Sequence, residues 1–193
     1  MSADRSALEQ RLSAATADDT VRGLIFNAGF GVVRRFLGEP EARACDPAQT
    51  ASRVPFFSYP VTDYVRFAWA AADLLEPQLG GTDAVFFELG AAATRDVLGS
   101  MLGRTLLSLS ADDPKELLAQ VPAGYRGTVS YGVRAIEWLG PNHAVVTYRR
   151  DFLVPPFHCG VLTAALQAIG RREVTATGHA VGLLDHDVEL AWR

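Results

Sequence analysis

The spacing of the apolar residues changes near residue 128, and this change constrains the fold more than any other feature of the sequence. Before it, apolar side chains recur every three or four residues, as in amphipathic helices. After it, residues 128–152 alternate around turn residues at 139–142, Pro155 to Ile169 show helical spacing, and residues 173–193 alternate again. The sequence therefore predicts an α+β fold, with a helical N-terminal part packed on a four-stranded antiparallel sheet and a hairpin–helix–hairpin C-terminal third.

One face of the predicted sheet is apolar, and the other carries polar residues that include Arg134 and Asp151. A sheet of this kind packs helices on one side only, and we expect the helices at 60–79 and 156–170 to cover it. The residues expected on the apolar face are Val129, Tyr131, Val133 and Ala135, then Ala144, Val146, Tyr148 and Phe152, then Val174 and Ala176, and finally Val188, Leu190 and Trp192.

The first two thirds of the chain contain the signals of several helices. Asp113, Pro114 and Glu116 give an N-cap, a first-turn proline and a capping box, and that helix is expected to end at Pro122. The spacing predicts helices at 1–15, 21–36, 60–79, 82–109 and 114–121, of which the first is expected to be loosely held.

Residues 38–58 read as a loop that is long for a compact domain. Either it contains a short helix near Pro40–Ala44 or it is a functional flap. The aromatic residues that close it, Phe56, Phe57 and Tyr59, are expected to fold back onto the core.

Length and composition fit one globular domain over residues 1–193. Hydrophobic residues make up 49% of the chain and charged residues 21%, and the net charge is −4. This charge disfavours binding to nucleic acid, which usually requires a basic face. The polar N-terminus lacks the apolar stretch of a signal peptide, and charged residues interrupt the apolar helices before they could span a bilayer. We expect a soluble, cytoplasmic protein in which Cys45 and Cys159 are free thiols, although a disulfide between them remains an alternative.

Motifs for catalysis, metal binding or nucleotide binding are absent from the sequence. His179 and His186, with Asp185 and Asp187 nearby, are either a metal site or, as we expect, a solvated hairpin tip. Cys159 follows a helix start, where a thiol pKa can fall, but a small buried residue is the favoured interpretation.

Glu88 lies among aromatic residues and is either a partly buried acid or a partner of Arg95 on the helix surface. We favour the surface partner. The catalytic alternative for the whole chain is an enzyme that uses Glu88 or Cys159.

Several short strings resemble a family of uncharacterised proteins of about this length that is expanded as paralogues in myxobacteria. They are Leu102-Gly103-Arg104, Asp112-Asp113-Pro114 with Leu117-Leu118, Pro122, and the Pro-Pro-Phe-His-Cys-Gly helix start before the last hairpin. The resemblance extends to the Tyr59-Pro60 helix start and so covers nearly the whole chain. These strings mark turns and the ends of helices, so they carry little information about function.

That family is similar in layout to the haem-nitric-oxide-binding and four-vinyl-reductase-like domains, which bind haem or other hydrophobic small molecules or act as regulatory partners. The resemblance implies a haem histidine on a helix ahead of the sheet, but the first histidine of this chain is His143. It also implies a Tyr-x-Ser-x-Arg run, which the string from Ser130 to Arg134 does not match. We therefore expect no haem and no other cofactor.

These observations predict a non-enzymatic sensory or regulatory module that binds an apolar small molecule or a protein partner. The alternative is an interaction scaffold that forms a homodimer or pairs with another protein through a sheet edge or an apolar patch. The candidate ligand-binding residues lie on the aromatic helices and on the apolar sheet face, with two candidate polar anchors. They are Tyr64, Phe67, Phe86, Tyr131 and Tyr148, with Arg104 or His158 as the anchor.

Overall fold

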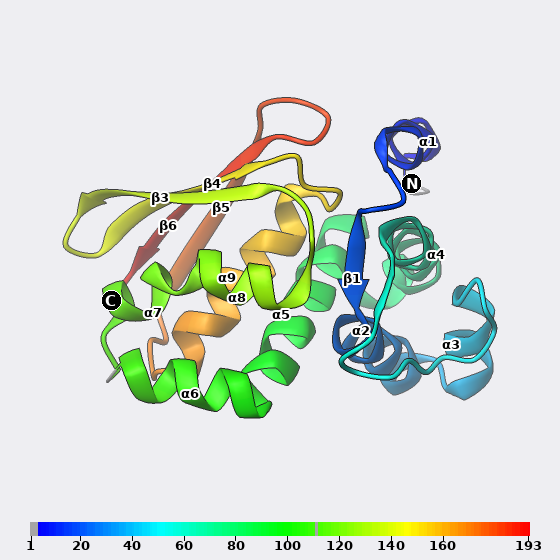
Figure 1. Ribbon diagram of the computed structural model, residues 1–193, viewed down its shortest axis with the longest axis horizontal. Helices are drawn as coiled ribbons and strands as arrows, with labels where there is room; N and C mark the ends of the chain where they lie inside the picture. Colours follow the sequence, from blue (N-terminus) through cyan, green and yellow to red (C-terminus); the bar gives the residue numbers. More distant parts are fainter. Residues whose placement is uncertain (1–3, 111) are drawn as a thin grey trace.

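The computed structural model describes residues 4–110 and 112–193, and it confirms the α+β fold. A group of helices forms one part, and a four-stranded sheet with its covering helices forms the other (Figure 1). The helices are α1 (Arg5–Ala14), α2 (Gly23–Phe36), α3 (Glu39–Cys45), α4 (Val61–Leu79), α5 (Thr82–Gly99), α6 (Met101–Ser110), α7 (Pro114–Ala119), α8 (Val121–Thr128) and α9 (Pro155–Ala168). The strands are β1 (Thr20–Arg22), β2 (Ser58–Pro60), β3 (Val133–Gly140), β4 (His143–Arg149), β5 (Val174–Ala180) and β6 (His186–Trp192). No helix among the described residues is long and apolar enough to cross a membrane.

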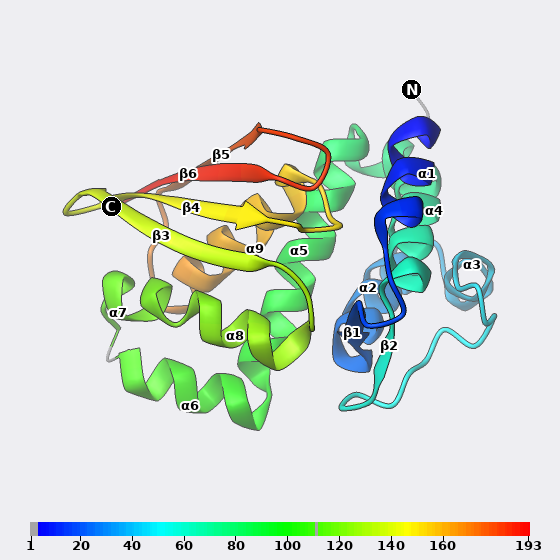
Figure 2. The same cartoon turned by 45° about the horizontal axis from the view of Figure 1, so that its top comes forward.

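The N-terminal part contains a short strand pair that the sequence did not predict. Strands β1 and β2 are antiparallel, and α2 consequently begins at Gly23 rather than just after Asp19. The amides of Gly23 and Leu24 donate to the carbonyls of Phe57 and Pro55, which fixes the start of the helix against the returning chain. Helix α1 lies along α4 (Figure 2). The Trp69 indole on α4 donates to the carbonyl of Asp4, just before α1. Residues 1–3 of the predicted first helix lie outside the described residues.

The 38–58 segment contains the short helix α3, so the helical alternative is correct. A buried ion pair between Asp46 and Arg53 holds the chain beyond it. Tyr59 packs edge-on against Phe26 as expected, but Phe56 and Phe57 are 70% and 55% exposed. The expectation that both fold onto the core was wrong, because the chain must turn there to enter β2.

Helices α5 and α9 cross at van der Waals distance and join the two parts of the molecule. Gly90 on α5 and Gly160 on α9 face each other's helix. A Cβ atom on Gly90 would lie 1.9 Å from the carbonyl oxygen of Phe157, and one on Gly160 would lie 1.9 Å from that of Phe87. The two backbones can approach this closely only because neither residue has a side chain.

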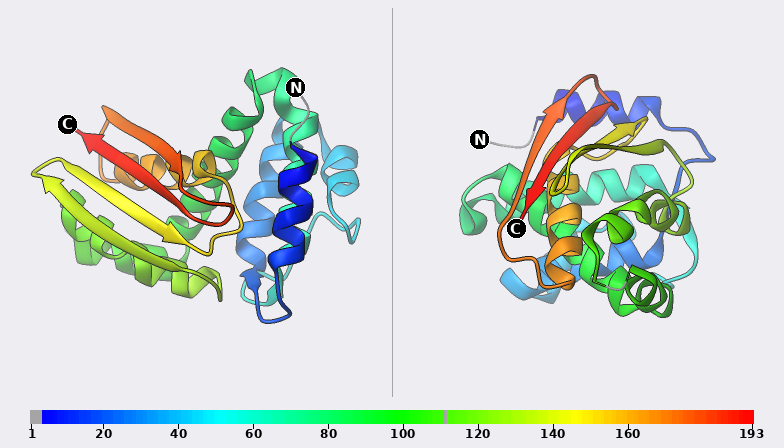
Figure 3. Two further views of the ribbon diagram at one scale, coloured as in Figure 1. Left: turned by 90° about the horizontal axis from the view of Figure 1, so that it is seen from above. Right: turned by 90° about the vertical axis from the view of Figure 1, so that its left-hand side faces the viewer.

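The sheet has the strand order β3-β4-β6-β5, and all three strand pairs are antiparallel. Its inner face is packed by α9 and by the α7–α8 segment (Figure 3). The predicted role of α9 is confirmed. The predicted role of the 60–79 helix is wrong, because α4 packs against α1, α2, α3 and α5 in the other part.

The prediction of which side chains point to the inner face of the sheet is correct for the central strands and wrong for β3. Ala144, Val146 and Tyr148 in β4, like Val188 and Leu190 in β6, are buried. In β3 the outward residues are Val133 and Ala135, whereas Arg134 points inward. The cause is Gly132, whose φ of +71° turns the chain after the buried Tyr131 and reverses the alternation.

A helix that the sequence analysis missed precedes β3. Pro122 does not end a helix but lies in the first turn of α8, after α7 has ended at Ala119. The N-cap at Asp113 is confirmed, because its side chain accepts from the amide of Lys115. Residues expected at the start of the first strand are thus helical up to Thr128.

Candidate functional site

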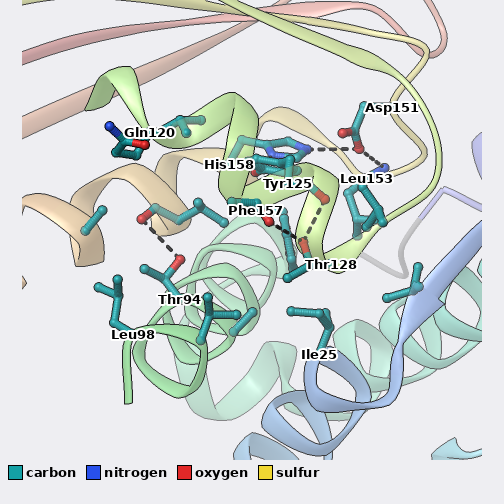
Figure 4. A pocket seen from close by; sticks show the side chains of 18 of the residues that line it. Ile25, Thr94, Leu98, Gln120, Tyr125, Thr128, Asp151, Leu153, Phe157 and His158 are labelled. Atoms are coloured by element: carbon teal, nitrogen blue, oxygen red, sulfur yellow. Dashed lines mark hydrogen bonds and ion pairs between the residues drawn. The ribbon is translucent and has the colours of Figure 1, made fainter. Parts of the chain in front are cut away.

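A cavity of about 110 Å³ lies where the hydrophobic core of the helical part meets that of the sheet part (Figure 4). Its lining residues come from helices of both parts, from β1 and from the segments that precede β3 and follow β4. The lining residues are Val21, Ile25, Tyr64, Ala93, Thr94, Val97, Leu98, Leu117, Gln120, Val121, Gly124, Tyr125, Thr128, Val129, Tyr131, Asp151, Leu153, Phe157, His158, Val161 and Ala165. Most of them are apolar, so the cavity suits an apolar molecule.

The one acidic side chain among the described lining residues, Asp151, lies beside His158 on one wall of the cavity (Figure 4). This residue is 1% exposed, forms a buried ion pair with Arg134, and accepts from the amide of Leu153 at 3.0 Å. Burial alone would raise the pKa of Asp151, but the neighbouring His158 and Arg134 outweigh it and hold this pKa well below its usual value. The strand alternation predicts Asp151 on the polar face of the sheet. It is buried because β4 ends at Arg149 and the left-handed conformation of Arg150, with φ of +55°, redirects the chain.

His158 connects this carboxylate to α8. Its Nε2 atom lies 3.1 Å from Oδ1 of Asp151. This is an ion-pair distance, but the two groups are not oriented to form a hydrogen bond. Its Nδ1 atom lies 2.6 Å from the hydroxyl oxygen of Tyr125. Burial raises the pKa of Tyr125 well above its usual value, so this phenol stays protonated. Both ring nitrogens of His158 therefore face neighbours within the protein.

Behind this wall, three rings stack under the sheet. Tyr148 lies 4.1 Å from His158 and 4.8 Å from His186 between ring centroids. Burial, together with the nearby His158, lowers the pKa of His186 to about 3. His186 is thus a neutral packing residue at physiological pH.

The structure brings three of the predicted ligand-binding residues to the cavity: Tyr64, Tyr131 and His158. The other four lie elsewhere. Phe67 packs against Phe30, Phe86 packs against Trp69, Tyr148 lies behind His158, and Arg104 is exposed on α6.

Sequence reasoning missed the contribution of α8, which brings Tyr125 and Thr128 to the cavity three residues apart. Thr128 donates to the carbonyls of Gly124 and Tyr125. The signal that could have found them is Pro122, which favours a helix start, followed by aromatic and polar residues at helical spacing.

The other candidate chemical groups of the sequence lie as follows in the described part of the chain. Among the described residues, no three His, Cys, Asp or Glu side chains are placed to hold a metal ion, and His186 is buried rather than at the hairpin tip. Cys45 and Cys159 are free and buried, and burial raises the pKa of each thiol to about 11. A thiol with such a pKa is not a thiolate at neutral pH. Glu88 pairs with Arg95 at 2.6 Å and with Arg35 at 2.7 Å, as the surface interpretation predicted.

Comparison with known proteins identifies the family of this chain. The family model described as "Protein of unknown function (DUF2378)" matches residues 14–193. The chain belongs to the DUF2378 family. No curated protein matches the sequence.

Solved structures similar to this DUF2378 chain include H-NOX proteins. The Fe(II) unliganded H-NOX protein from K. algicida is 11% identical, with a TM-score of 0.69, over 89% of this chain and 96% of that one. The H-NOX protein from S. oneidensis in the Fe(II)NO ligation state is 13% identical, with a TM-score of 0.68, over 89% and 99%. An oxygen-binding H-NOX domain related to soluble guanylate cyclases is 9% identical, with a TM-score of 0.60, over 89% and 95%. At these identities the likeness shows a shared fold.

The residues of the DUF2378 cavity do not fit a haem. The described lining residues include one histidine and no cysteine or methionine, and both nitrogens of that histidine face Tyr125 and Asp151. The volume of about 110 Å³ is also well below the roughly 300 Å³ at which pockets for drug-sized ligands begin. A haem would require these side chains to move apart.

Proposed function

We propose that this chain is a sensory module that binds a small apolar molecule in the cavity between its two parts. The observation that carries the proposal is the position of this cavity at the junction of two hydrophobic clusters, with a mostly apolar lining and a few polar groups. Pockets that bind small molecules commonly combine these features.

The contacts of the polar wall support a sensory role rather than simple storage. Tyr125 on α8 contacts His158 on α9, which contacts Asp151, which pairs with Arg134 on β3. An occupant that displaces α8 would therefore alter contacts that reach the sheet. Binding shifts a conformational equilibrium when the ligand interacts differently with the two states.

The free and buried Cys45 and Cys159 support a location in a reducing compartment such as the cytoplasm. The exposed Phe56 and Phe57 support a contact with another protein or with a second copy of the chain. We propose such a partner as the receiver of the signal.

The test of ligand binding is a thermal-unfolding assay with toluene, cyclohexanol and phenol. A ligand at 100 times its Kd stabilises the fold by about 2.7 kcal/mol. We expect Tm to rise by about 5–10 °C for at least one of these molecules, since 1 kcal/mol corresponds to about 2–4 °C in a domain of this size.

Two neighbouring alanines on α5 provide the matched variants. Ala93 lines the cavity and Ala92 does not, although both are buried. Ala93→Leu should fill the cavity and abolish the ligand-induced rise in Tm, whereas Ala92→Leu should retain it. No rise with any of the three molecules, or an equal rise in both variants, would contradict the proposal.

A further inference from the structure

Tyr64 lines the cavity, and its buried hydroxyl group has no hydrogen-bond partner among the described side chains and backbone groups. Tyr64 lies on α4, is 1% exposed and lines the cavity. Its oxygen is buried and has no hydrogen-bond partner in the described part of the chain. The large majority of buried polar side-chain atoms in proteins do have a partner.

The ring of Tyr64 is held in place by its neighbours. It packs edge-on against Phe26 at 5.0 Å and Phe157 at 6.3 Å between centroids, and beside Phe67 at 5.8 Å. Burial raises the pKa of Tyr64 far above its usual value. The hydroxyl is therefore a fixed, neutral group that can both donate and accept a hydrogen bond.

Several other polar groups of the cavity already have partners. Tyr125 contacts His158, Thr94 donates to the carbonyl of Val161, and Thr128 donates to α8 carbonyls. The carboxylate of Asp151 forms an ion pair with Arg134 and lies at ion-pair distance from His158. The Nε2 atom of His158 also lacks a hydrogen bond, but it lies at ion-pair distance from Asp151. The hydroxyl of Tyr64 differs from these groups in having no polar partner in the described part of the chain.

The volume and charge of the cavity limit what this occupant can be. An engineered apolar cavity of about 150 Å³ holds benzene, so about 110 Å³ admits at most one small ring or a short chain. The described lining residues include no lysine or arginine. Since burying an unpaired charge is costly, the occupant should be neutral.

We propose that the ligand is a small neutral molecule with one hydrogen-bonding oxygen, such as a phenol, an alcohol or a carbonyl compound, and that Tyr64 bonds this oxygen. This inference rests on the proposed function, because it assumes that the cavity binds a small molecule. Tyr64 then determines the specificity of the site, since a site with a free hydrogen-bonding group favours ligands that can satisfy it.

The test compares phenol with toluene, which have the same number of heavy atoms and differ in one polar group. Calorimetry gives the Kd of each for the wild type and for Tyr64→Phe. We expect the ratio of phenol to toluene affinity to fall about tenfold in Tyr64→Phe, with toluene binding unchanged. Tyr148→Phe, which alters a buried tyrosine outside the cavity, should leave the ratio at its wild-type value.

A second measurement reports on Tyr64 without any ligand. Removing an unsatisfied buried hydroxyl should not destabilise the free protein, so the Tm of Tyr64→Phe should equal or exceed that of the wild type. A marked fall in Tm would mean that the hydroxyl has a partner within the protein and would overturn the inference. An unchanged affinity ratio would also overturn it, while continued toluene binding would leave the proposed function intact. Binding of neither molecule would overturn both.

Discussion

His186 shows how a single buried side chain makes the fold sensitive to acid. The ring is 2% exposed and stacks on Tyr148, and burial next to His158 lowers its pKa to about 3. The unfolded chain takes up a proton at this position near pH 6.5, and the folded protein does not. The stability that follows from the neutral ring is therefore fully present above pH 6.5 and is lost as pH falls toward 3.

Protonation of His186 in the unfolded chain should lower the free energy of unfolding by up to about 1.4 kcal/mol for each pH unit below pH 6. Urea unfolding at several pH values between 6.5 and 4.5 measures this slope. His186→Phe keeps a stacked ring but cannot be protonated, so its slope should be smaller by that amount. The range stops at 4.5 because Asp19 and Asp46, whose pKa values are lowered to about 2 by arginine and backbone partners, contribute only at lower pH. Equal slopes in the two proteins would refute this assignment.

The contact between α5 and α9 shows what sequence patterns reveal about an element and what they miss. Helical spacing and the Pro155–Gly170 boundaries predicted α9 almost to the residue. The meeting of Gly90 and Gly160 could not be predicted, because they are far apart in the chain and glycine leaves no hydrophobic pattern. The reversed faces of β3 were missed for a similar reason, since one turn residue, Gly132, shifts the alternation of the strand that follows it.

The same substitution should have opposite effects on two helical glycines. Gly160→Ala would place a Cβ atom against the backbone of α5 and should destabilise the fold by about 1–3 kcal/mol or more. Gly31 on α2 has no neighbouring atom within 4 Å, so Gly31→Ala should stabilise by about 0.5–1 kcal/mol through helix propensity. Equilibrium urea unfolding distinguishes the two, and a neutral Gly160→Ala would show that the helices can separate without cost.

Across the whole molecule, the segment around Asp151 ties the helical part to the sheet part. Arg11 on α1 donates to the backbone carbonyl of Asp151, and Arg150 beside it pairs with Asp19. The sequence predicted the fold class, and three of the seven candidate ligand-binding residues line the cavity. These contacts of Arg11 and Arg150 could not be predicted. Periodicity shows which face of an element is apolar, but it does not show which charged side chains from distant elements pair with one another.

Removal of the Asp151 charge should be among the more damaging substitutions of the protein. Asp151→Asn leaves Arg134 buried without its counter-charge and should cost about 3–5 kcal/mol of unfolding free energy. The double variant Asp151→Asn, Arg134→Met should recover much of this loss, because it also removes the charge of Arg134, while the buried Arg11 beside Asp151 is the same in both variants. Denaturant unfolding of the four proteins in this cycle checks the coupling, and simple additivity would show that the two residues act independently.

The loose packing of α8 has a consequence for how fast an occupant would enter and leave the cavity. This helix lines the cavity through Tyr125 and Thr128, yet it has no fully buried residue. Segments with few buried contacts open locally at a small fraction of the global unfolding free energy. The arrival and departure of an occupant would then be timed by the lifting of α8 rather than by diffusion, so the on-rate should be slow and nearly independent of the occupant's chemistry, while its residence time reports its fit.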